Sequence, residues 1–239
     1  MKIAIMQPYF LPYIGYWQLI NTVDTFVIYD NIQYSKKGWY NKNNILLNNK
    51  KTIFTIPLKK DSDSLDVIER FLADNSKKQK TKILAQITMS YKNAPYFDDM
   101  YLLLENIFLN EEKNLFTYIY NSVLKICDYL DIDTNIIVSS SIDVDHSLRA
   151  QEKVIAINKA LNSTEYINPI GGIELYKIDD FEKENIKLNF LESNVPKYKQ
   201  FNDEFTPYLS IIDILMFNSR SEIKAMLNAF EIKKGDNNV

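Results

Sequence analysis

Residues 2–30 read "KIAIMQPYFLPYIGYWQLINTVDTFVIYD", and this stretch decides the fold. Its apolar run at 2–6 ends at Gln-Pro, which is typical of a buried strand. The run at 25–30 is rich in β-branched and aromatic side chains and predicts a second strand. Between them, apolar residues from Ile14 to Ile20 suit a helix. A strand, a helix and a strand in this order form a βαβ unit, whose two strands are parallel.

The rest of the chain continues this alternation, with one long helical interruption and no internal repeat or Gly/Ser-rich linker. We therefore predict a single α/β domain over 1–239: a Rossmann-like parallel sheet with a helical insertion at about 76–131 and a helical C-terminus. The other expected strands are a hairpin over 43–58 with its loop at 48–51, and strands at 135–140, at 186–192 and at 165–172, the last of which leads into a Gly turn. The other expected helices lie at 148–161 and at 208–219. A last helix is capped by Ser219 and ends at Phe230, and the tail at 233–239 is expected to fray.

The composition excludes several classes of protein. The chain is 46% hydrophobic and 25% charged, which suits an ordinary globular protein, and no apolar run approaches the ~20 residues that span a bilayer. We expect no membrane insertion and no signal peptide. The single cysteine, Cys127, excludes an internal disulfide and indicates a reducing compartment, so we expect a cytoplasmic protein with an inert, buried thiol.

The charges are unevenly distributed along the chain. Residues 1–110 hold 14 Lys and Arg against 10 Asp and Glu, and residues 111–239 hold 14 against 21. A phosphate-bearing ligand bound by the N-terminal half fits this asymmetry, although solvated lysines on loops account for it as well. The pI of about 5.4 makes nucleic acid an improbable partner unless a charged tRNA serves as a donor.

The loop that follows the first strand is the first candidate site. It contains prolines that restrict it, a glycine that allows close approach, and tyrosines that offer a flat ring with a polar tip. Ligands of parallel α/β sheets bind beyond the carboxyl ends of the strands, where this loop begins. Its rings suit contact with a sugar or a base, and they also suit the packing of a tight corner. The candidates are Gln7, Pro8, Tyr9, Tyr13, Gly15 and Tyr16.

The stretch "YDNIQYSKKGWYNKNN" at 29–44 follows the second strand and should meet the first loop at the same edge of the sheet. Both tryptophans and ten of the 31 aromatic residues lie between 7 and 40. Lysines screen phosphate and asparagines bond hydroxyls, so two such loops predict a pocket for a nucleotide-linked sugar. Asp30 and Lys37 are the expected catalytic residues, and the expected binding residues are Gln33, Tyr34, Lys36, Trp39, Asn41 and Asn43.

Further candidates follow the later strands. Gly171 and Gly172 form either a turn with positive φ or part of the pocket, without a dinucleotide or P-loop spacing, and the same edge holds Tyr176, Tyr198 and Gln200. Asp213 lies in the apolar run "IIDILMF" and needs a partner, or else faces solvent. The one histidine, His146, is expected to be exposed just before a helix, and one His with one Cys makes no metal set. We expect no metal and no cofactor.

The segments "MQPYFLPYIGYWQLI", "VDTFVIYDNIQYSKKGWYNKNNI", "YKNAPYF", "YINPIGGIELY" and "YLSIIDILMFN" resemble, in this order, the WbqC-like protein family. The resemblance covers essentially the whole chain. It implies a role in bacterial O-antigen, lipopolysaccharide or surface-polysaccharide biosynthesis, and a glycine (aminoacyl) transferase activity for some members.

This chain departs from the family pattern in one block. The family has a tryptophan and then, after one residue, Asn-Arg-Asn-Arg. Trp39, Asn41 and Asn43 match it, but Lys42 and Asn44 replace the arginines, so no bidentate contact to phosphate is available there. Many relatives also have a histidine before the "YKNAPYF" helix, which "KKQK" at 77–80 lacks.

A second similarity concerns the layout of the N-terminus. The strand, Pro-rich loop and "YIGY" are arranged like the strand, loop and His-x-Gly-His of nucleotidyltransferases, with Tyr13 and Tyr16 in place of the histidines. Neutral tyrosines would steady phosphates poorly. The layout therefore implies a nucleotidyltransferase-like fold without adenylylation chemistry.

Three functions remain open. The first is transfer of a glycyl or other small acyl group from an activated acyl or aminoacyl donor onto the amine of a nucleotide-linked amino sugar. In it Asp30 takes the proton or orients the amine, and Lys37 with Asn41 and Asn43 holds diphosphate or carbonyl oxygen. The second is a non-catalytic binding or assembly protein of the same pathway, and the third is an ATP-using ligase.

Overall fold

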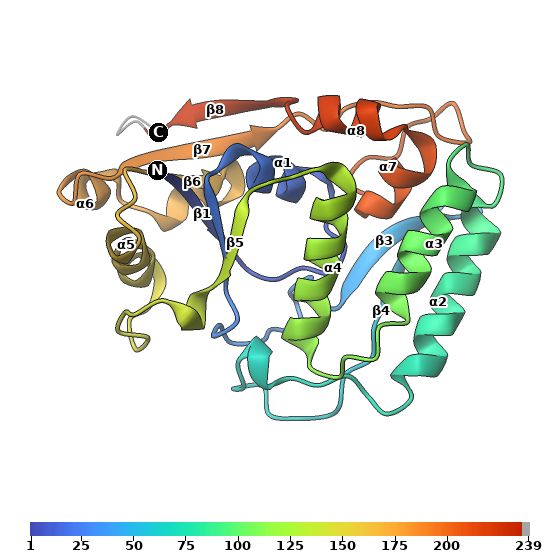
Figure 1. The fold of residues 1–239 in the computed structure, drawn as a ribbon, viewed down its shortest axis with the longest axis horizontal. Coiled ribbons are helices and arrows are strands. Elements are labelled where there is room, and N and C mark those ends of the chain that lie inside the picture. Colours follow the sequence, from blue (N-terminus) through green and yellow to red (C-terminus); the bar gives the residue numbers. More distant parts are fainter. Residues whose placement is uncertain (236–239) are drawn as a thin grey trace.

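A six-stranded sheet forms the centre of the protein, whose computed structural model describes residues 1–235 (Figure 1). The strand order is β5-β2-β1-β6-β7-β8, with five parallel strands and β8 antiparallel at one edge. This order is that of the Rossmann fold, so the predicted α/β class is confirmed. The strands are β1 (Lys2–Met6), β2 (Thr25–Ile28), β5 (Asn135–Val138), β6 (Glu165–Pro169), β7 (Lys187–Ser193) and β8 (Phe230–Lys234).

Helices cover both faces of the sheet, which explains why its central strands are almost continuously apolar. Ile3 and Ile5 of β1 pack on the face covered by α5 (Ala150–Ala160) and α6 (Ile178–Glu182). Ala4, between them, belongs to the core on the opposite face, with α1 (Ile14–Thr22) and α4 (Leu115–Leu130). Figure 1 shows α5 and α6 on one side of the sheet and α1 and α4 on the other.

The chain between β2 and β5 forms a separate layer beside the sheet (Figure 1). It begins with the predicted hairpin, whose strands are β3 (Lys42–Leu47) and β4 (Lys50–Thr55). The two turn residues, Asn48 and Asn49, both have positive φ, as a tight hairpin turn requires. The short 3-10 helix η1 (Val67–Glu69) and the helices α2 (Ser76–Tyr91), α3 (Phe97–Phe108) and α4 follow. The helical periodicity expected from 76 to 131 is confirmed.

The C-terminal region differs from the prediction in one element. Helices α7 (Ile211–Phe217) and α8 (Arg220–Met226) form as expected, and Ser219 and Glu222 make the capping box. The last helix ends at Met226 rather than at Phe230, and 230–234 pairs with β7 as the edge strand β8. Charged residues are typical of exposed edge strands, so this polar segment gave no strand signal. Of the tail expected to fray, 233 and 234 lie in β8, and 236–239 lie outside the described residues.

The loop between β1 and α1 joins the sheet to the insertion. Asn43 Nδ2 of β3 donates to the carbonyl oxygens of Phe10 (3.2 Å) and Leu11 (2.7 Å). Ser210 Oγ also donates to the Leu11 oxygen, at 2.7 Å. The Phe10 ring stacks on the Tyr118 ring of α4, with the ring centroids 5.1 Å apart. The loop in which we predicted a ligand site therefore serves largely to connect the sheet to the insertion.

Asp213 forms a second joint, between α7, α2 and the loop before α7. Its carboxylate accepts hydrogen bonds from Tyr91 Oη (2.9 Å), Tyr198 Oη (2.6 Å) and Gln200 Nε2 (2.8 Å). The residue is fully buried, and burial raises the pKa of its carboxyl group. Of the two alternatives left open for Asp213, the structure shows the partnered one.

Two further expectations concern the core and the membrane. Cys127 is buried in α4, where burial raises the pKa of its thiol to about 12, as expected for a core cysteine. Within residues 1–235, no helix combines the length and the apolar character needed to cross a bilayer.

Replacing Asn43 with Ala is expected to destabilise the fold, because two buried carbonyl groups lose their amide donor. We expect a loss of about 1–3 kcal/mol in the free energy of unfolding, measured by urea denaturation. Asn44→Ala is the matched control. Asn44 is the next residue along β3, it is half-buried, and its side-chain amide makes no hydrogen bond among those described. Equal stability of the two variants would contradict the role of the joint.

Asp213→Asn is expected to remove a pH-dependent part of the stability. The folded-state pKa of Asp213 lies above its unfolded value, so the folded protein binds more protons and loses stability as pH rises above about 4. Urea unfolding of both proteins from pH 4 upwards should show the wild type losing stability relative to the Asn variant. A difference between them that does not change with pH would contradict the assignment.

Candidate functional site

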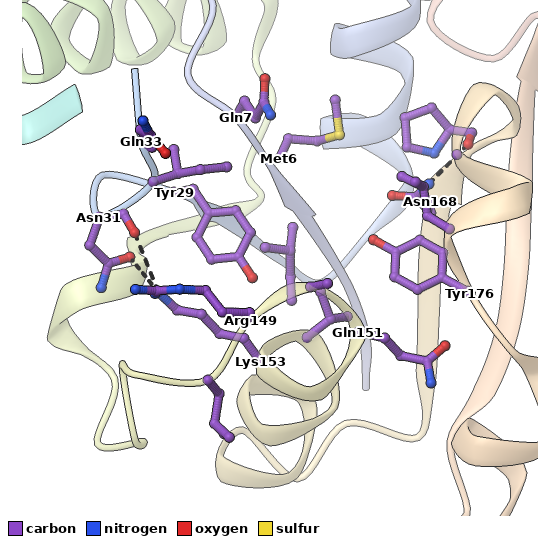
Figure 2. A pocket seen from close by; sticks show the side chains of 18 of the residues that line it. Met6, Gln7, Tyr29, Asn31, Gln33, Arg149, Gln151, Lys153, Asn168 and Tyr176 are labelled. Atoms are coloured by element: carbon purple, nitrogen blue, oxygen red, sulfur yellow. Dashed lines mark hydrogen bonds between the residues drawn. The ribbon is translucent and has the colours of Figure 1, made fainter. Parts of the chain in front are cut away.

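A cavity of about 630 Å³ lies at the carboxyl ends of β1, β2 and β6 (Figure 2). It occupies the place where the strand order reverses direction, between β1 and β6, which is where open parallel sheets bind ligands. Its walls also include the start of α5 and a short segment before η1. The lining residues are Ile5, Met6, Gln7, Tyr9, Tyr29, Asn31, Ile32, Gln33, Ser64, Asp66, Leu148, Arg149, Ala150, Gln151, Lys153, Val154, Asn168, Pro169, Gly171, Gly172, Leu175 and Tyr176.

One side of the cavity is cationic. Figure 2 shows Asn31, Arg149 and Lys153 gathered there, with the ring of Tyr29 beside them. Lys153 Nζ lies 5.3 Å from the centre of the Tyr29 ring and donates to Asn31 Oδ1 at 3.2 Å. Burial, together with the nearby Arg149 charge, lowers the pKa of Lys153. The β5–α5 crossover brings both cations to this side.

The opposite side is polar and uncharged, and it comes from β6 and the 3-10 helix η3 (Ile170–Leu175). Figure 2 shows Asn168 and Tyr176 there. The Tyr166 hydroxyl donates to Asn168 Oδ1 at 3.1 Å and lies 3.1 Å from the Tyr176 hydroxyl. Gly172 makes room for the Asn168 side chain, because a Cβ there would clash with Asn168 Nδ2. This side can hydrogen-bond hydroxyl or amide groups of a ligand.

Asp66 is the one carboxylate among the described residues that line the cavity. It precedes η1 and forms a capping box there with Glu69, whose side chain accepts the Asp66 N–H at 2.8 Å and whose N–H donates to the Asp66 backbone oxygen at 3.0 Å. Burial, together with the Glu69 charge, raises the pKa of Asp66, and the charges of Lys153 and Arg149 act in the opposite direction. A half-buried carboxylate in this setting can accept a proton.

The structure brings six of the predicted site residues to the cavity. They come from three strand ends that are far apart in the sequence: Gln7, Tyr9, Gln33, Gly171, Gly172 and Tyr176. Two alternatives were open for Gly171 and Gly172, a turn with positive φ or part of the pocket. Neither glycine has positive φ, and both line the cavity, so the structure shows the second alternative.

The other predicted residues lie outside the cavity, and most of them have structural partners. These residues are Pro8, Tyr13, Gly15, Tyr16, Asp30, Tyr34, Lys36, Lys37, Trp39, Asn41, Asn43, Tyr198 and Gln200. The Tyr34 hydroxyl donates to Asn41 Oδ1 at 3.1 Å, and the Tyr16 hydroxyl donates to the backbone oxygen of Gln7 at 3.0 Å. Lys36 is paired with Asp63 on the surface.

Neither of the two residues expected to act in catalysis, Asp30 and Lys37, lines the cavity. The Asp30 carboxylate is buried and accepts hydrogen bonds from Ser139 Oγ (2.8 Å) and Ser140 N (3.0 Å) in the 3-10 helix η2 (Ser139–Ser141). Lys37 is exposed on the loop before β3, and Trp39 is 43% exposed nearby. Asp30 therefore tethers η2 to β2 rather than facing a ligand.

Sequence reasoning missed six polar residues that the site description rests on: Tyr29, Asn31, Asp66, Arg149, Lys153 and Asn168. Tyr29 and Asn31 flank Asp30 in the stretch that was singled out, but the chain bends at Asp30 after β2, and the Asp30 carboxylate is held by Ser139 and Ser140 instead of lining the cavity. The signal for Arg149 and Lys153 was present in the predicted helix at 148–161, which follows a parallel strand and so begins at the ligand edge.

His146 lies just before α5, as expected, but it is half-buried rather than exposed. Its Nδ1 lies 2.9 Å from Asn31 Nδ2, so it supports a cavity residue without lining the cavity itself. Across residues 1–235, no group of three or more His, Cys, Asp or Glu side chains is arranged to hold a metal ion.

The strand order defines a Rossmann-like α/β protein, and the cavity lies at the switch point of its sheet. The sequence profile of the WbqC-like protein family matches residues 7–225, and the chain belongs to this family. It is also 28% identical over 223 residues to "Uncharacterized protein Rv1507c" of Mycobacterium tuberculosis, which covers 92% of this chain and 95% of that protein. No solved structure matches the chain significantly.

The two glycines of η3 are expected to respond differently to substitution. A Cβ at Gly172 would displace the Asn168 amide, which is buried and hydrogen-bonded, whereas a Cβ at Gly171 would meet nothing within 4 Å. Gly172→Ala should therefore cost about 1–3 kcal/mol of stability, and Gly171→Ala should leave the melting temperature almost unchanged. Thermal unfolding of both variants checks this, and equal effects would show that Asn168 moves freely.

Proposed function

We propose that this protein is a transferase of bacterial O-antigen or surface-polysaccharide biosynthesis that moves a glycyl or other small acyl group onto the amine of a nucleotide-linked amino sugar. The observation that supports it most directly is the cavity, which combines rings, amides, two cations and one carboxylate in about 630 Å³. This volume lies within the usual range for small-molecule sites. Membership of the WbqC-like family supports the pathway.

The two sides of the cavity suit the two kinds of group in such a ligand. A sugar presents hydroxyl groups, which match the neutral side with Asn168 and Tyr176, and it packs well against rings such as those of Tyr9 and Tyr29. The nucleotide's negative charge matches the side with Arg149 and Lys153. A second, activated donor would enter through the open part of the cavity.

In the proposed reaction, the sugar amine attacks the carbonyl carbon of the donor. A C–N bond forms, the bond from the carbonyl carbon to the donor's sulfur or oxygen breaks, and the leaving group departs with that electron pair. The amine proton passes to Asp66, the carboxylate that lines the cavity. Its raised pKa makes it a better proton acceptor than an ordinary surface aspartate. Most of the rate enhancement comes from positioning, which can lower a barrier by roughly 7–11 kcal/mol at best.

A non-catalytic sugar-nucleotide-binding protein is the second candidate. The observation that favours it is that Asp66 already belongs to the capping box at the start of η1. A carboxylate used in this way is typical of a structural cap.

Asp66→Asn separates the two candidates, because asparagine keeps the capping geometry and loses the basic oxygen. The purified protein is mixed with a UDP-linked amino sugar and either a glycyl thioester, an acetyl thioester, or glycine with ATP, and the amide product is measured by mass spectrometry. We expect an amide product from the wild type and a rate roughly a hundredfold lower in the variant, with ligand affinity retained.

Asp63→Asn is the matched control, since Asp63 lies on the same segment, is exposed and does not line the cavity. It should react like the wild type. Ligand binding without any product would contradict the transferase and favour the binding protein. Product that requires ATP, with release of pyrophosphate, would favour a ligase instead.

A further inference from the structure

Lys153 is a buried cation that forms no salt bridge within residues 1–235. It is 5% exposed, and its ammonium group donates to Asn31 Oδ1 (3.2 Å) and to the Asn31 backbone oxygen (3.4 Å). Among the described residues, no carboxylate forms a salt bridge with it. Buried charges in proteins are normally paired, because removing them from water is costly. Lys153 therefore has capacity for an anion at salt-bridge distance, which the described residues do not provide.

The two nearby acidic residues do not fill this role. The Asp30 carboxylate is already held by Ser139 Oγ and the Ser140 amide. Asp66 is used at the start of η1 and makes no salt bridge with either cation among the described residues. The pocket side formed by Asn31, Arg149 and Lys153 therefore presents two cations that no described carboxylate pairs at salt-bridge distance.

Arg149 adds a second cation whose donors are largely uncommitted. Its side chain is exposed at the cavity wall, and Nη1 donates only a long hydrogen bond of 3.4 Å to the His146 oxygen among the contacts described. A guanidinium group offers a planar fork that matches two oxygens of one phosphate. Helix α5 begins beside it without a side-chain cap, which adds a favourable dipole.

The position of Lys153 is fixed before any ligand arrives. Asn31, which holds the ammonium group, is itself held on both sides of its amide. Ser139 Oγ lies 2.6 Å from Asn31 Oδ1, and His146 Nδ1 lies 2.9 Å from Asn31 Nδ2. The chain from Asp30 through Ser139 to Asn31 thus orients the lysine toward the cavity. Such preorganisation reduces the entropy lost on binding.

We infer that Arg149 and Lys153, with Asn31, form the binding site for the diphosphate of the ligand, and that Asn31, Ser139 and Asp30 act as positioning residues behind it. The inference deepens the proposed function, on which it rests for the sugar part of the ligand. It places the phosphates on the β2–α5 side of the cavity and the sugar hydroxyl groups on the β6 side, next to Asn168 and Tyr176.

Isothermal titration with UDP, with a UDP-linked amino sugar and with the free amino sugar tests this inference. The variant Lys153→Met keeps the volume and removes the charge, Lys153→Arg keeps the charge, and Lys159→Met is the matched control on the same helix, exposed and paired with Glu184. We expect the affinity for UDP to fall roughly ten- to a hundredfold in Lys153→Met. The control should bind like the wild type, and Lys153→Arg should recover part of the affinity.

Two further readouts separate a phosphate site from a purely structural lysine. Affinity for UDP should fall as the salt concentration rises, and this dependence should be weaker in Lys153→Met than in the wild type. The Asn31→Ala variant should weaken UDP binding without changing binding of the free amino sugar. Circular dichroism confirms that each variant is folded before it is titrated.

The inference is overturned if UDP does not bind the wild type, or if it binds Lys153→Met and the wild type equally well. These results are separate from the test of the transferase. UDP binding that depends on Lys153, without any amide product, supports the phosphate site and contradicts the transferase. Amide formation on an amino sugar without phosphate, unaffected in Lys153→Met, supports the transferase and contradicts the phosphate site.

Discussion

The parallel pairing of β1 with β2 on one side and with β6 on the other is the constraint on which the rest of the structure depends. Because the chain leaves β1 in one direction and returns to its other side much later, a crevice opens where the two connections diverge. The polar ends of three strands converge there without any local sequence motif. The chemistry of the site is thus a result of topology, and its residues are spread from Ile5 to Tyr176.

The layer inserted between β2 and β5 depends on this sheet and is fastened to it by polar contacts as well as by apolar packing. Asn43 holds the loop after β1, and Asp213 gathers two tyrosines and a glutamine from distant segments. Such buried polar groups cost free energy unless each one is satisfied, so they specify one arrangement of the layers. This explains why the most recognisable family segments contain residues that do not face the cavity.

The order of the parallel strands and of the longer helices was predictable from periodicity, because buried parallel strands and amphipathic helices have strong patterns, whereas the five-residue helix α6 was not predicted. The strand β8 was not, since its charged residues on an exposed edge resemble a disordered tail. The site was predictable only as an edge of the sheet. Asp30 and its neighbours Tyr29 and Asn31 share one strand end, and only the backbone geometry decides which of them faces the cavity.

Asp66 lies both in the cavity wall and in the capping box of η1, and this position joins the cavity to local folding. The carbonyl oxygen of Arg70, the residue after η1, accepts the N–H of Leu115 at the start of α4. A ligand that hydrogen-bonds to the Asp66 carboxylate shifts the equilibrium between the closed and the frayed form of η1. The size of the shift is set by the difference in the ligand's binding free energy for the two forms. Amide hydrogen exchange at the first turn of α4 would then report on events in a cavity that α4 does not line.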